Sequence, residues 1–374
     1  MPIPFIDLQA QRRRLGPRIE AAIGRVLESG QFILGAEVRQ FEAALAHFGQ
    51  AKHAVACANG TDALLIPLRG WGVGPGDAVF CPSFTFAATA EVVALAGATP
   101  VFVDVLSDTY NMDAAHLDRA IAAVAKQGAL RPRAVIAVDL FGQPADYPAI
   151  AAVAAKHKLK LIADSAQSFG CTLNAKHPLA WADAATTSFF PAKPLGCYGD
   201  GGAILTNSDE DMAVFRSVAV HGQGADRYDN VRIGLNSRLD TIQAAILIEK
   251  LAIFADEIEK REAIAQRYIA GLKAHVRAAP TVIAGGVSTW AQFTIEHDDR
   301  DGLAAHLKAA DVPTAIYYPR PLHQQTAYRH FPHGEGGLPV SEAIAQRVLS
   351  LPMHPYLDAP TQDRIVAAVA AFRG

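Results

Sequence analysis

Residues 133–164, "RAVIAVDLFGQPADYPAIAAVAAKHKLKLIAD", contain two short apolar runs separated by a stretch with helical spacing. The runs "RAVIAVDL" and "LKLIAD" are continuous in Val, Ile, Leu and Ala and do not alternate with polar residues. Such runs are typical of strands that are buried on both faces of a parallel sheet. A strand, a crossover helix and a second strand form the basic unit of an α/β domain, so this segment predicts that fold class.

The same pattern extends outward from this unit, from about residue 50 to residue 220. Another amphipathic stretch, "HLDRAIAAVAKQ", occupies residues 116–127. The further strand candidates are residues 53–58, 77–83, 99–105, 185–190 and 202–206. Together with the two central runs, they predict one large, mostly parallel sheet of seven strands.

The region after the sheet begins with a helical stripe of apolar residues from about 239 to 275. Ser237 and Asp240 resemble a capping pair that opens a helix. We expect this long helix to join a large α/β domain (1–245) to a smaller C-terminal α+β domain (246–374). In the smaller domain we expect strands at 289–296 and 313–319, and helices at 300–310, 341–350 and 361–372.

Composition and charge exclude several classes of protein. Of the 374 residues, 51% are hydrophobic and 19% are charged, which indicates a globular chain. The net charge is −3, and the basic run at 12–14 is too short to indicate binding of nucleic acid. The first residues lack the pattern of a secretory signal, and no apolar run is long enough to span a membrane. We therefore expect a cytoplasmic protein with no membrane partner.

Neither the cysteines nor the histidines predict a metal site. No C-x-x-C pair occurs, and we expect buried free thiols in a reducing cytoplasm; the four cysteines are Cys57, Cys81, Cys171 and Cys197. One Pro-containing loop, "PLHQQTAYRHFPH" (321–333), holds three histidines, His323, His330 and His333. No carboxylate in this loop completes a convincing set of ligands, so we expect no metal.

Lys193 is a candidate nucleophile because of the loop that surrounds it. In "SFFPAKPLG" (188–196) it stands between Pro191 and Pro194, which exclude a continuous helix. The pattern predicts a strand, a tight loop and then a second strand at "GGAILT" (201–206). A stiff loop can hold an amine for attack on an aldehyde. An ordinary loop lysine is the alternative.

A candidate phosphate site follows the first strand. In "HAVACANGTDALLIPL" (53–68) a short turn with Gly60 precedes a helix that opens at Thr61 and Asp62. The N-terminus of a helix offers free N–H groups and a positive dipole, which suit a phosphate. Ser188, five residues before Lys193, could add its hydroxyl. The alternative is a simple capped helix.

Two other strand ends carry groups that suit a flat, protonated ring. Asp164 ends the apolar run "LKLIAD", and Gln167 follows three residues later. A deep carboxylate needs a partner, and the protonated nitrogen of a pyridine ring would be one. Phe84 and Phe86 follow another strand, where one of them could stack on a ring. A turn-capping aspartate and core phenylalanines are the alternatives. In combination with Lys193 and the phosphate turn, these groups describe a site for pyridoxal phosphate.

Five sequence blocks resemble one protein family. They are "NGTDAL" (59–64), "PSFTFAATAE" (82–91), "DSAQSFG" (164–170), "SFFPAKPLGCYGDGGAI" (188–204) and "GLNSRLDTIQAAIL" (234–247). In this order they are similar to the DegT-type sugar-nucleotide aminotransferases, which have fold type I of the pyridoxal phosphate enzymes. The resemblance runs from "IPFIDL" (3–8) to "SLPMHPYL" (350–357), which is nearly the whole chain.

The resemblance implies a role for each residue of the cofactor site. Lys193 is the catalytic residue that forms the Schiff base, Asp164 pairs with the pyridine nitrogen, Gln167 lies near the ring hydroxyl and Phe86 stacks on the ring. The phosphate is bound by the turn at Gly60 with Thr61, Asp62 and Ser188. Asn236 is donated by a neighbouring subunit, which implies a homodimer with shared active sites.

The resemblance also suggests substrate contacts. Tyr318 and His323 belong to the family's "YPxPLH" segment, which faces the sugar nucleotide. Two arginines flank Asn236 and could bind a diphosphate or a sugar carboxylate, or form surface ion pairs; they are Arg232 and Arg238. Two positions depart from the family. Ser165 stands where alanine is frequent, which looks harmless, and Tyr317 stands where a His-Tyr pair is common, which leaves the details of the sugar pocket open.

The implied function is transfer of an amino group from an amino acid, with L-glutamate as the expected donor, to the ketone of a nucleotide-linked sugar. "SFFPAKPLGCYGDGGA" and "HGQGADRY" (221–228) most resemble the branch that aminates C3 of UDP-2-acetamido-2-deoxy-3-oxo-glucuronate for surface polysaccharide or O-antigen. The alternatives are C3 or C4 amination of another dTDP-, GDP- or UDP-sugar, or a regulatory or dehydratase role. Dehydratases of this fold carry His at the position of Lys193. A cysteine desulfurase is a further alternative, but no cysteine stands in an obvious catalytic loop.

Overall fold

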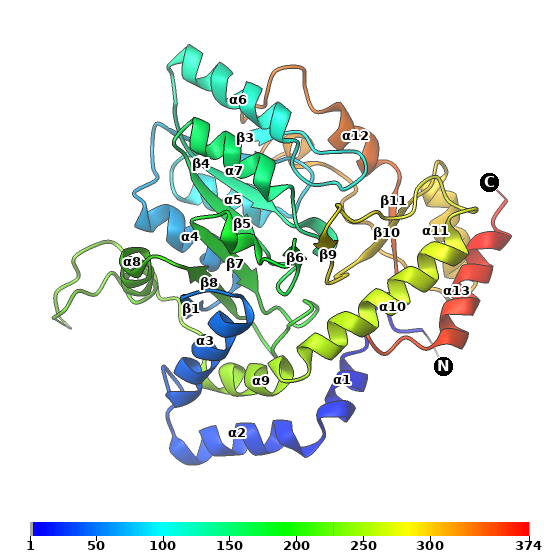
Figure 1. Cartoon of the computed structure of the whole chain (residues 1–374), viewed down its shortest axis with the longest axis horizontal. Helices are drawn as coiled ribbons and strands as arrows, with labels where there is room; N and C mark the ends of the chain where they lie inside the picture. The colour runs from blue at the N-terminus through cyan, green and yellow to red at the C-terminus, as the bar shows by residue number, and fades with distance from the viewer. Residues whose placement is uncertain (1–2, 227, 374) are drawn as a thin grey trace.

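A seven-stranded sheet forms the centre of the computed structural model, which describes residues 3–226 and 228–373 (Figure 1). Arg227, within "HGQGADRY", lies outside the described residues. The strands are β1 (His53–Cys57), β2 (Asp77–Pro82), β3 (Thr99–Val103), β4 (Arg131–Val138), β5 (Lys160–Asp164), β7 (Ala184–Ser188) and β8 (Gly202–Thr206). Their order is β1-β8-β7-β5-β4-β2-β3, and β8 alone runs antiparallel to its neighbours. The predicted sheet is confirmed.

Helices cover both faces of the sheet, which explains why its strands are apolar at successive positions. The helices are α3 (Ala36–Phe48), α4 (Gly60–Gly70), α5 (Ala88–Leu95), α6 (Ala114–Gln127), α7 (Tyr147–Lys156) and α8 (Asp209–Ala219). On one face, Val135 and Ala137 of β4 belong to an apolar cluster with residues of α3, α6 and α7. On the other face, Ala134 and Ile136 belong to a cluster with α4 and α5. Successive side chains of a strand point to opposite faces, so both sets must be apolar.

The helix predicted from 239 to 275 is two helices. The helices of this layer are α1 (Leu8–Leu15), α2 (Pro17–Ser29), α9 (Thr241–Leu251) and α10 (Phe254–Leu272). The break has a tightened turn in which Ile253 N donates to Lys250 O, and neither glycine nor proline marks it. α9 packs on α2 and α3, whereas α10 continues towards α13 (Ala359–Ala371), so the change of direction serves two different packing surfaces (Figure 1). The predicted capping pair is also wrong: Asp240 makes no side-chain cap, and the Ser237 hydroxyl accepts from Ala58 N.

The C-terminal region differs from the expectation at two segments. Its elements are β10 (Phe293–Glu296), α11 (Arg300–Ala309), α12 (Pro339–Ala345) and β11 (Val348–Leu351). Residues 313–319 form no strand beyond a single bridge between Ala315 and Ser350. The helix expected at 341–350 ends at Ala345, and the next apolar run forms β11, which pairs with β10. Every residue of β11 is buried, so cross-strand packing outweighs helical propensity there.

The small remaining elements are η1 (Leu140–Gly142), η2 (Pro178–Ala180), η3 (Leu322–Gln324), β6 (Thr172–Leu173) and β9 (Gly286–Val287). The segment around η3 lies against the large sheet although it belongs to the predicted small domain (246–374). Leu322 and Leu338 belong to the α4–α5 cluster. Phe102 of the edge strand β3 donates its N–H to Pro332 O and accepts from Gly334 N. The division at residues 245 and 246 stays a prediction, and this contact shows that the later part of the chain also shapes the edge of the large sheet.

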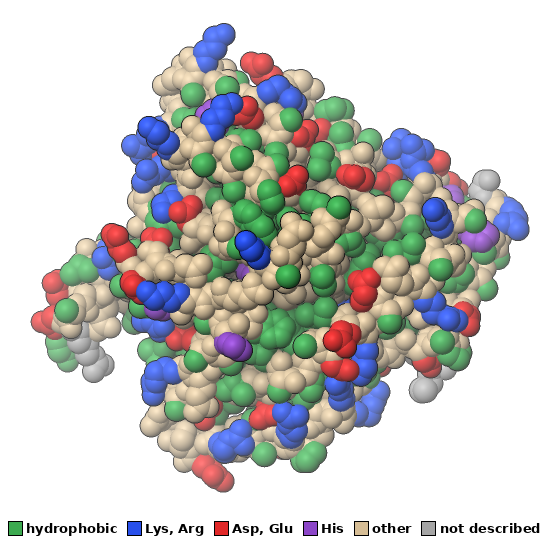
Figure 2. Space-filling model, viewed as in Figure 1, with side chains coloured by type: hydrophobic (Ala, Val, Ile, Leu, Met, Phe, Trp, Pro, Cys, Tyr) green, Lys and Arg blue, Asp and Glu red, His purple; other side chains and the backbone are tan. Residues whose placement is uncertain are grey.

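Both ends of the described chain lie beside the C-terminal core, as Figure 1 shows. Ile3 belongs to the apolar cluster that α10, α11 and α13 form. Figure 2 shows positive and negative side chains interspersed over one face of the molecule. Among the described residues, no helix is both long and apolar enough to cross a membrane.

Candidate active site

The ends of β5 and β7 bring the two main candidate residues to the same edge of the sheet. Asp164 is the last residue of β5 and is paired with Thr186 of β7. Lys193 lies in the loop that follows β7. This loop is fixed by its own backbone, since Phe189 N donates to Gly201 O at 2.7 Å and Lys193 N donates to Phe190 O at 2.8 Å. The stiff loop predicted from the two prolines is therefore present.

Lys193 and Asp164 influence each other electrostatically. Burial lowers the pKa of the Lys193 amine, and the negative charge of Asp164 partly opposes this shift. Burial raises the pKa of Asp164, which is opposed by the N–H of Ala166, by the charge of Lys193 and by the hydroxyl of Thr89. Each residue thus favours the charged form of the other. Thr89 is a contact that the sequence did not single out.

The predicted phosphate turn is assembled from three segments. α4 begins at Gly60, and its N-cap is Asn59, whose side chain accepts from Asp62 N at 2.8 Å. A Cβ atom on Gly60 would lie 2.6 Å from Cβ of Ser188, so only glycine allows these segments to meet. Gly202 is equally restricted, because its Cβ would lie 2.3 Å from the carbonyl oxygen of Asn59.

The position of the first helical hydrogen bond determines which N–H groups of this turn have no acceptor within the helix. The first helical bond runs from Ala63 N to Asn59 O, so the N–H groups of Gly60 and Thr61 precede it. Asp62 differs, because its N–H is already held by Asn59. The helix is capped by Asn59, as the alternative reading expected, and the phosphate site at the turn beside Ser188 stays a prediction.

Gln167 connects the sheet to the C-terminal part of the chain. Its Oε1 accepts from Phe141 N at 2.8 Å, and its Nε2 donates to the hydroxyl of Tyr318 at 3.0 Å. Tyr318 and Phe86 have ring centroids 6.4 Å apart. Phe86 is 56% exposed, whereas Phe84 is 1% exposed and packs in the core. Of the two phenylalanines, Phe86 is the one whose ring is accessible for stacking.

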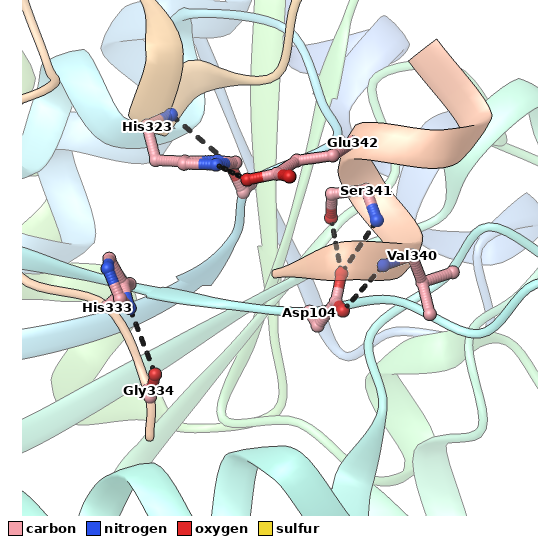
Figure 3. Close-up of polar contacts among 8 residues, drawn as sticks. Asp104, His323, His333, Gly334, Val340, Ser341 and Glu342 are labelled. Atoms are coloured by element: carbon pink, nitrogen blue, oxygen red, sulfur yellow. Dashed lines mark hydrogen bonds and ion pairs between the residues drawn. The ribbon is translucent and has the colours of Figure 1, made fainter. Parts of the chain in front are cut away.

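His323 is held by the protein on both sides of its ring (Figure 3). Nδ1 lies 2.7 Å from Oγ of Ser83, and Nε2 lies 2.9 Å from a carboxylate oxygen of Glu342. Nearby, the buried carboxylate of Asp104 accepts from the N–H groups of Val340 and Ser341 at the start of α12. These contacts fasten α12 and His323 to the ends of β2 and β3. His323 therefore has a positioning role in this segment, and its contact with the sugar stays a prediction.

The three histidines of this loop are not gathered around one point. His333 Nδ1 is paired with the carbonyl of Gly334, as Figure 3 shows, and His330 packs on Phe331. Within residues 3–226 and 228–373, no group of three or more His, Cys, Asp or Glu side chains is arranged to hold a metal ion.

The residue after Asn236 contacts the segment that leads into the phosphate turn of the same chain, since Oγ of Ser237 accepts from Ala58 N at 3.1 Å. Asn236 is exposed and follows the segment that projects beyond α8 in Figure 1. Arg238 lines a cavity of about 500 Å³ with Glu42 and Arg216, and this cavity includes neither Lys193 nor Asp164. Arg232 is exposed and contacts the hydroxyl of Ser217. The roles of Asn236, Arg232 and Arg238 at the cofactor or the substrate stay predictions.

Comparison with known proteins assigns this arrangement to a family. Residues 14–370 match the model of the DegT/DnrJ/EryC1/StrS aminotransferase family. The chain belongs to this family. It is 49% identical to the UDP-2-acetamido-2-deoxy-3-oxo-D-glucuronate aminotransferase of Pseudomonas aeruginosa, over 98% of this chain and 99% of that protein. The family, the fold type and the enzyme class expected from the sequence are confirmed.

Two solved structures support the same assignment. A DegT DnrJ EryC1 StrS aminotransferase from Brucella abortus is 55% identical and superposes with a TM-score of 0.98 over 100% of both chains. NtdA of Bacillus subtilis, with the bound cofactor PMP, is 28% identical and has a TM-score of 0.88, covering 98% of this chain and 84% of that one.

The residues at the strand ends fit pyridoxal phosphate. The group requires an amine for its aldehyde, a carboxylate for its ring nitrogen, N–H groups for its phosphate and a flat apolar surface for its ring. Lys193, Asp164, the turn at Gly60 and Phe86 offer these in turn. In addition, Oγ1 of Thr186, which is paired in register with Asp164, is buried and has no hydrogen-bond partner among the described residues.

Proposed function

We propose that this chain transfers an amino group from L-glutamate to the C3 ketone of UDP-2-acetamido-2-deoxy-3-oxo-glucuronate, with pyridoxal phosphate as cofactor, in the synthesis of a surface polysaccharide. One observation carries the chemistry: Lys193 and Asp164 lie at neighbouring strand ends, and each favours the charged form of the other. The identity of 49% to the Pseudomonas aeruginosa enzyme supports this sugar.

Lys193 acts twice in this function. When bound, pyridoxal phosphate supplies a conjugated ring that withdraws electrons from the carbon that exchanges its amino group. Lys193 holds the cofactor through Nζ and, once released, moves a proton to and from that carbon. Burial lowers the pKa of this amine, so more of it is unprotonated near neutral pH than on an exposed lysine.

The other residues bind and orient. The carboxylate of Asp164 keeps the ring nitrogen protonated, and a positive ring nitrogen in turn offsets the cost of burying this carboxylate. The N–H groups of Gly60 and Thr61 and the hydroxyl of Ser188 hold the phosphate. Asp62, in the first turn of α4, belongs to the same phosphate-binding turn. Phe86 covers one face of the ring, and Gln167 lies beside the ring hydroxyl.

The first experiment separates the amino donor from the sugar. The purified protein is loaded with pyridoxal phosphate and given L-glutamate alone, and 2-oxoglutarate is quantified. We expect one equivalent per site and a change in visible absorbance. No release of the corresponding 2-oxo acid, either from L-glutamate or from any other amino acid, would contradict the aminotransferase mechanism.

The second experiment identifies the sugar. The glutamate-treated protein is offered the UDP-linked 3-oxo uronic acid, its neutral 6-hydroxyl analogue and dTDP- or GDP-linked keto-sugars, and mass spectrometry detects the amino sugar. We expect the uronic acid to react fastest. Preference for another nucleotide or for a C4 ketone would replace this substrate and leave the aminotransferase assignment in place.

We also propose a homodimer with shared sites. Large apolar side chains are exposed on two segments that adjoin Asn236, namely Leu27, Phe32, Ile33 and Leu34 on one and Tyr228, Val231 and Ile233 on the other. Leu34 and Tyr228 line the same open cavity of about 900 Å³. Clustered exposed apolar groups favour an interface, and here a second copy brings Asn236 to the phosphate of the first.

Subunit exchange tests the shared site. Lys193→Ala chains are mixed with Asn236→Asp chains, each poor alone. In a mixed dimer, one site carries both changes and the other carries neither, so activity should recover towards one good site per mixed dimer. Exchange without recovery would place Asn236 in its own chain's site.

Arg238 is proposed to bind the carboxylate of the sugar across the same interface, since it lies two residues from Asn236. Arg238→Gln should slow the reaction of the uronic acid much more than that of its neutral analogue, and equal losses would assign the arginine to the diphosphate or the fold.

For location we propose the cytoplasm, because all four cysteines are free and buried, which fits a reducing compartment.

A further inference from the structure

A second buried carboxylate lies next to the site but belongs to none of the motifs. Asp139 follows β4, the strand beside β5, and its side chain is fully buried. Oδ2 accepts from the hydroxyls of Ser165 at 2.7 Å and Ser168 at 2.8 Å. Oδ1 accepts from the hydroxyl of Tyr147 at 2.8 Å and from Ala145 N at 2.9 Å. Both oxygens are therefore filled by donors.

No cation within residues 3–226 and 228–373 forms an ion pair with this carboxylate. Burial raises the pKa of Asp139 to about 6, and the N–H and hydroxyl donors oppose that shift. A buried charge that is held only by hydrogen bonds is costly compared with apolar packing. The thiol of Cys171 also donates to Oδ2, at 3.8 Å, and a proton on either carboxylate oxygen would compete with the donors at that oxygen.

The donors connect Asp139 to the turn that carries two site residues. Ser165 directly follows Asp164, and Ser168 directly follows Gln167. The backbone repeats the connection, since Asp139 N donates to Asp164 O at 3.0 Å. On the other side, Phe141 N, two residues after Asp139, donates to Oε1 of Gln167. The two loops that leave β4 and β5 are thus joined both by the carboxylate and by the amide of Gln167.

We propose that Asp139 is a positioning residue: its carboxylate fixes the turn 165–168 and thereby sets where Asp164 and Gln167 meet the ring of pyridoxal phosphate. The inference rests on the proposed function for the identity of the bound group. It also gives a role to Ser165, which departs from the alanine that is frequent in the family: its hydroxyl has a specific acceptor rather than being a neutral replacement.

The carboxylate offers its own matched control. The Tyr147 hydroxyl donates to the same carboxylate as the serines, but Tyr147 opens α7 and lies outside the turn. Tyr147→Phe removes one donor to Asp139 without changing the turn. Ser165→Ala and Tyr147→Phe each remove one donor to Asp139, so they should cost similar stability if Asp139 is only structural, and should differ at the cofactor site if Asp139 positions the turn.

The experiment compares Ser165→Ala, the double variant Ser165→Ala/Ser168→Ala and Tyr147→Phe with the unchanged chain. The melting temperature is measured without cofactor, the dissociation constant of pyridoxal phosphate by titrating the cofactor-free protein, and the midpoint of the visible absorbance from its pH dependence. We expect the double variant to bind pyridoxal phosphate about tenfold more weakly and to shift the absorbance midpoint. The reason is that a displaced turn weakens the charge-assisted hydrogen bond between Asp164 and the ring of the cofactor. Tyr147→Phe should lower the melting temperature but keep both other values.

Two failures can be told apart. If the unchanged chain does not bind pyridoxal phosphate, the proposed function falls, and this inference falls with it. If the unchanged chain binds and the double variant binds equally well with the same absorbance midpoint, the inference alone is overturned. Should the double variant fail to fold, Ser165→Ala decides, because this alanine is frequent in the family; an unchanged dissociation constant and midpoint in that variant would overturn the proposal.

Discussion

Two lysines are associated with the same loop, one within it and one on α9, and the contrast between them explains which one is available for chemistry. Lys193 lies within the loop and no hydrogen bond or ion pair from the described residues holds its amine, although the charge of Asp164 acts on it. Lys250, on α9, donates from Nζ to Gly196 O at 2.6 Å and lies 4.2 Å from the ring centre of Tyr198. Burial lowers the pKa of both amines.

A lowered pKa therefore does not identify a catalytic lysine by itself. Desolvation disfavours the charged form of both amines, but Lys250 donates to a carbonyl and contacts an aromatic face, whereas the Lys193 amine is acted on by the charge of Asp164. The lysine with an unfilled amine is available for a covalent bond, and the other fastens α9 to the loop. We therefore expect Lys193 to be the reactive lysine and Lys250 to have a structural role only.

The largest effect concerns the covalent bond to the cofactor. Borohydride reduction of the loaded protein followed by peptide mapping should label Lys193. Lys193→Ala should still bind pyridoxal phosphate through the Gly60 turn, Ser188 and Asp164 but lose turnover by several orders of magnitude, because the nucleophile and the proton carrier are both gone. A label on Lys250 would mean that Lys250 binds the cofactor, and normal turnover by Lys193→Ala would mean that Lys193 is not needed for the reaction.

The next effect concerns the carboxylate that Lys193 faces. Asp164→Asn keeps the shape but cannot hold the ring nitrogen protonated. Loss of one charge-assisted hydrogen bond costs about 1.5–3 kcal/mol in binding, and the loss in turnover should be larger. Steady-state kinetics and cofactor titration check both. An asparagine variant that transaminates at the normal rate would reduce Asp164 to a turn cap.

The fold class and the large sheet could be predicted from the sequence, and so could the edge of the sheet at which the candidate site residues lie. Asp164, Ser188 and Lys193 follow apolar runs, and parallel strands end at one edge, so strand patterns alone bring them together. The break at Ile253 could not be predicted, because it is caused by two packing surfaces and not by a local breaker. β11 was mistaken for helix because "VLSL" is too short to show a period.

The residues that support the site were the hardest to find. Asn59 is part of the motif "NGTDAL", but the serine partners of Asp139, the histidine partner of Glu342 and the carbonyl partner of Lys250 are 19 to 54 residues away in sequence. In a sequence, a buried charge can be recognised only from the residues next to it along the chain. The desolvation free energy of that charge, however, is offset by residues that are close in space. Asp164 was recognised because its strand ends on it, and Lys250 was not because its helix shows no sign of the loop beyond.

A smaller effect is expected from the lysine that fastens the loop. Lys250→Met keeps a side chain of similar length but leaves Gly196 O without this donor, which costs about 1–3 kcal/mol and is offset by no longer burying an amine. We expect a change of a few degrees in melting temperature, less than a tenfold loss in turnover, and borohydride labelling that stays on Lys193. A loss of turnover as large as that of Lys193→Ala would mean that both lysines act in the reaction.

The smallest effect is the pH dependence that Lys250 gives to stability. Its pKa is lowered to about 8, chiefly by burial and against the opposing charges of Cys197 and Glu257, while a lysine in the unfolded chain has a pKa of about 10.4. Between these values the unfolded chain binds more protons, so the free energy of unfolding must rise with pH. Lys193 shifts in the same direction but is present in both proteins, so the difference between the unchanged chain and Lys250→Met isolates Lys250. Denaturant unfolding of the cofactor-free proteins at pH 7 and pH 10 should show this difference increasing by about 1–3 kcal/mol in favour of the unchanged chain. A difference that stays constant would mean that the Lys250 amine remains hydrated. Burial against a carbonyl would then not be the property that distinguishes Lys250 from Lys193.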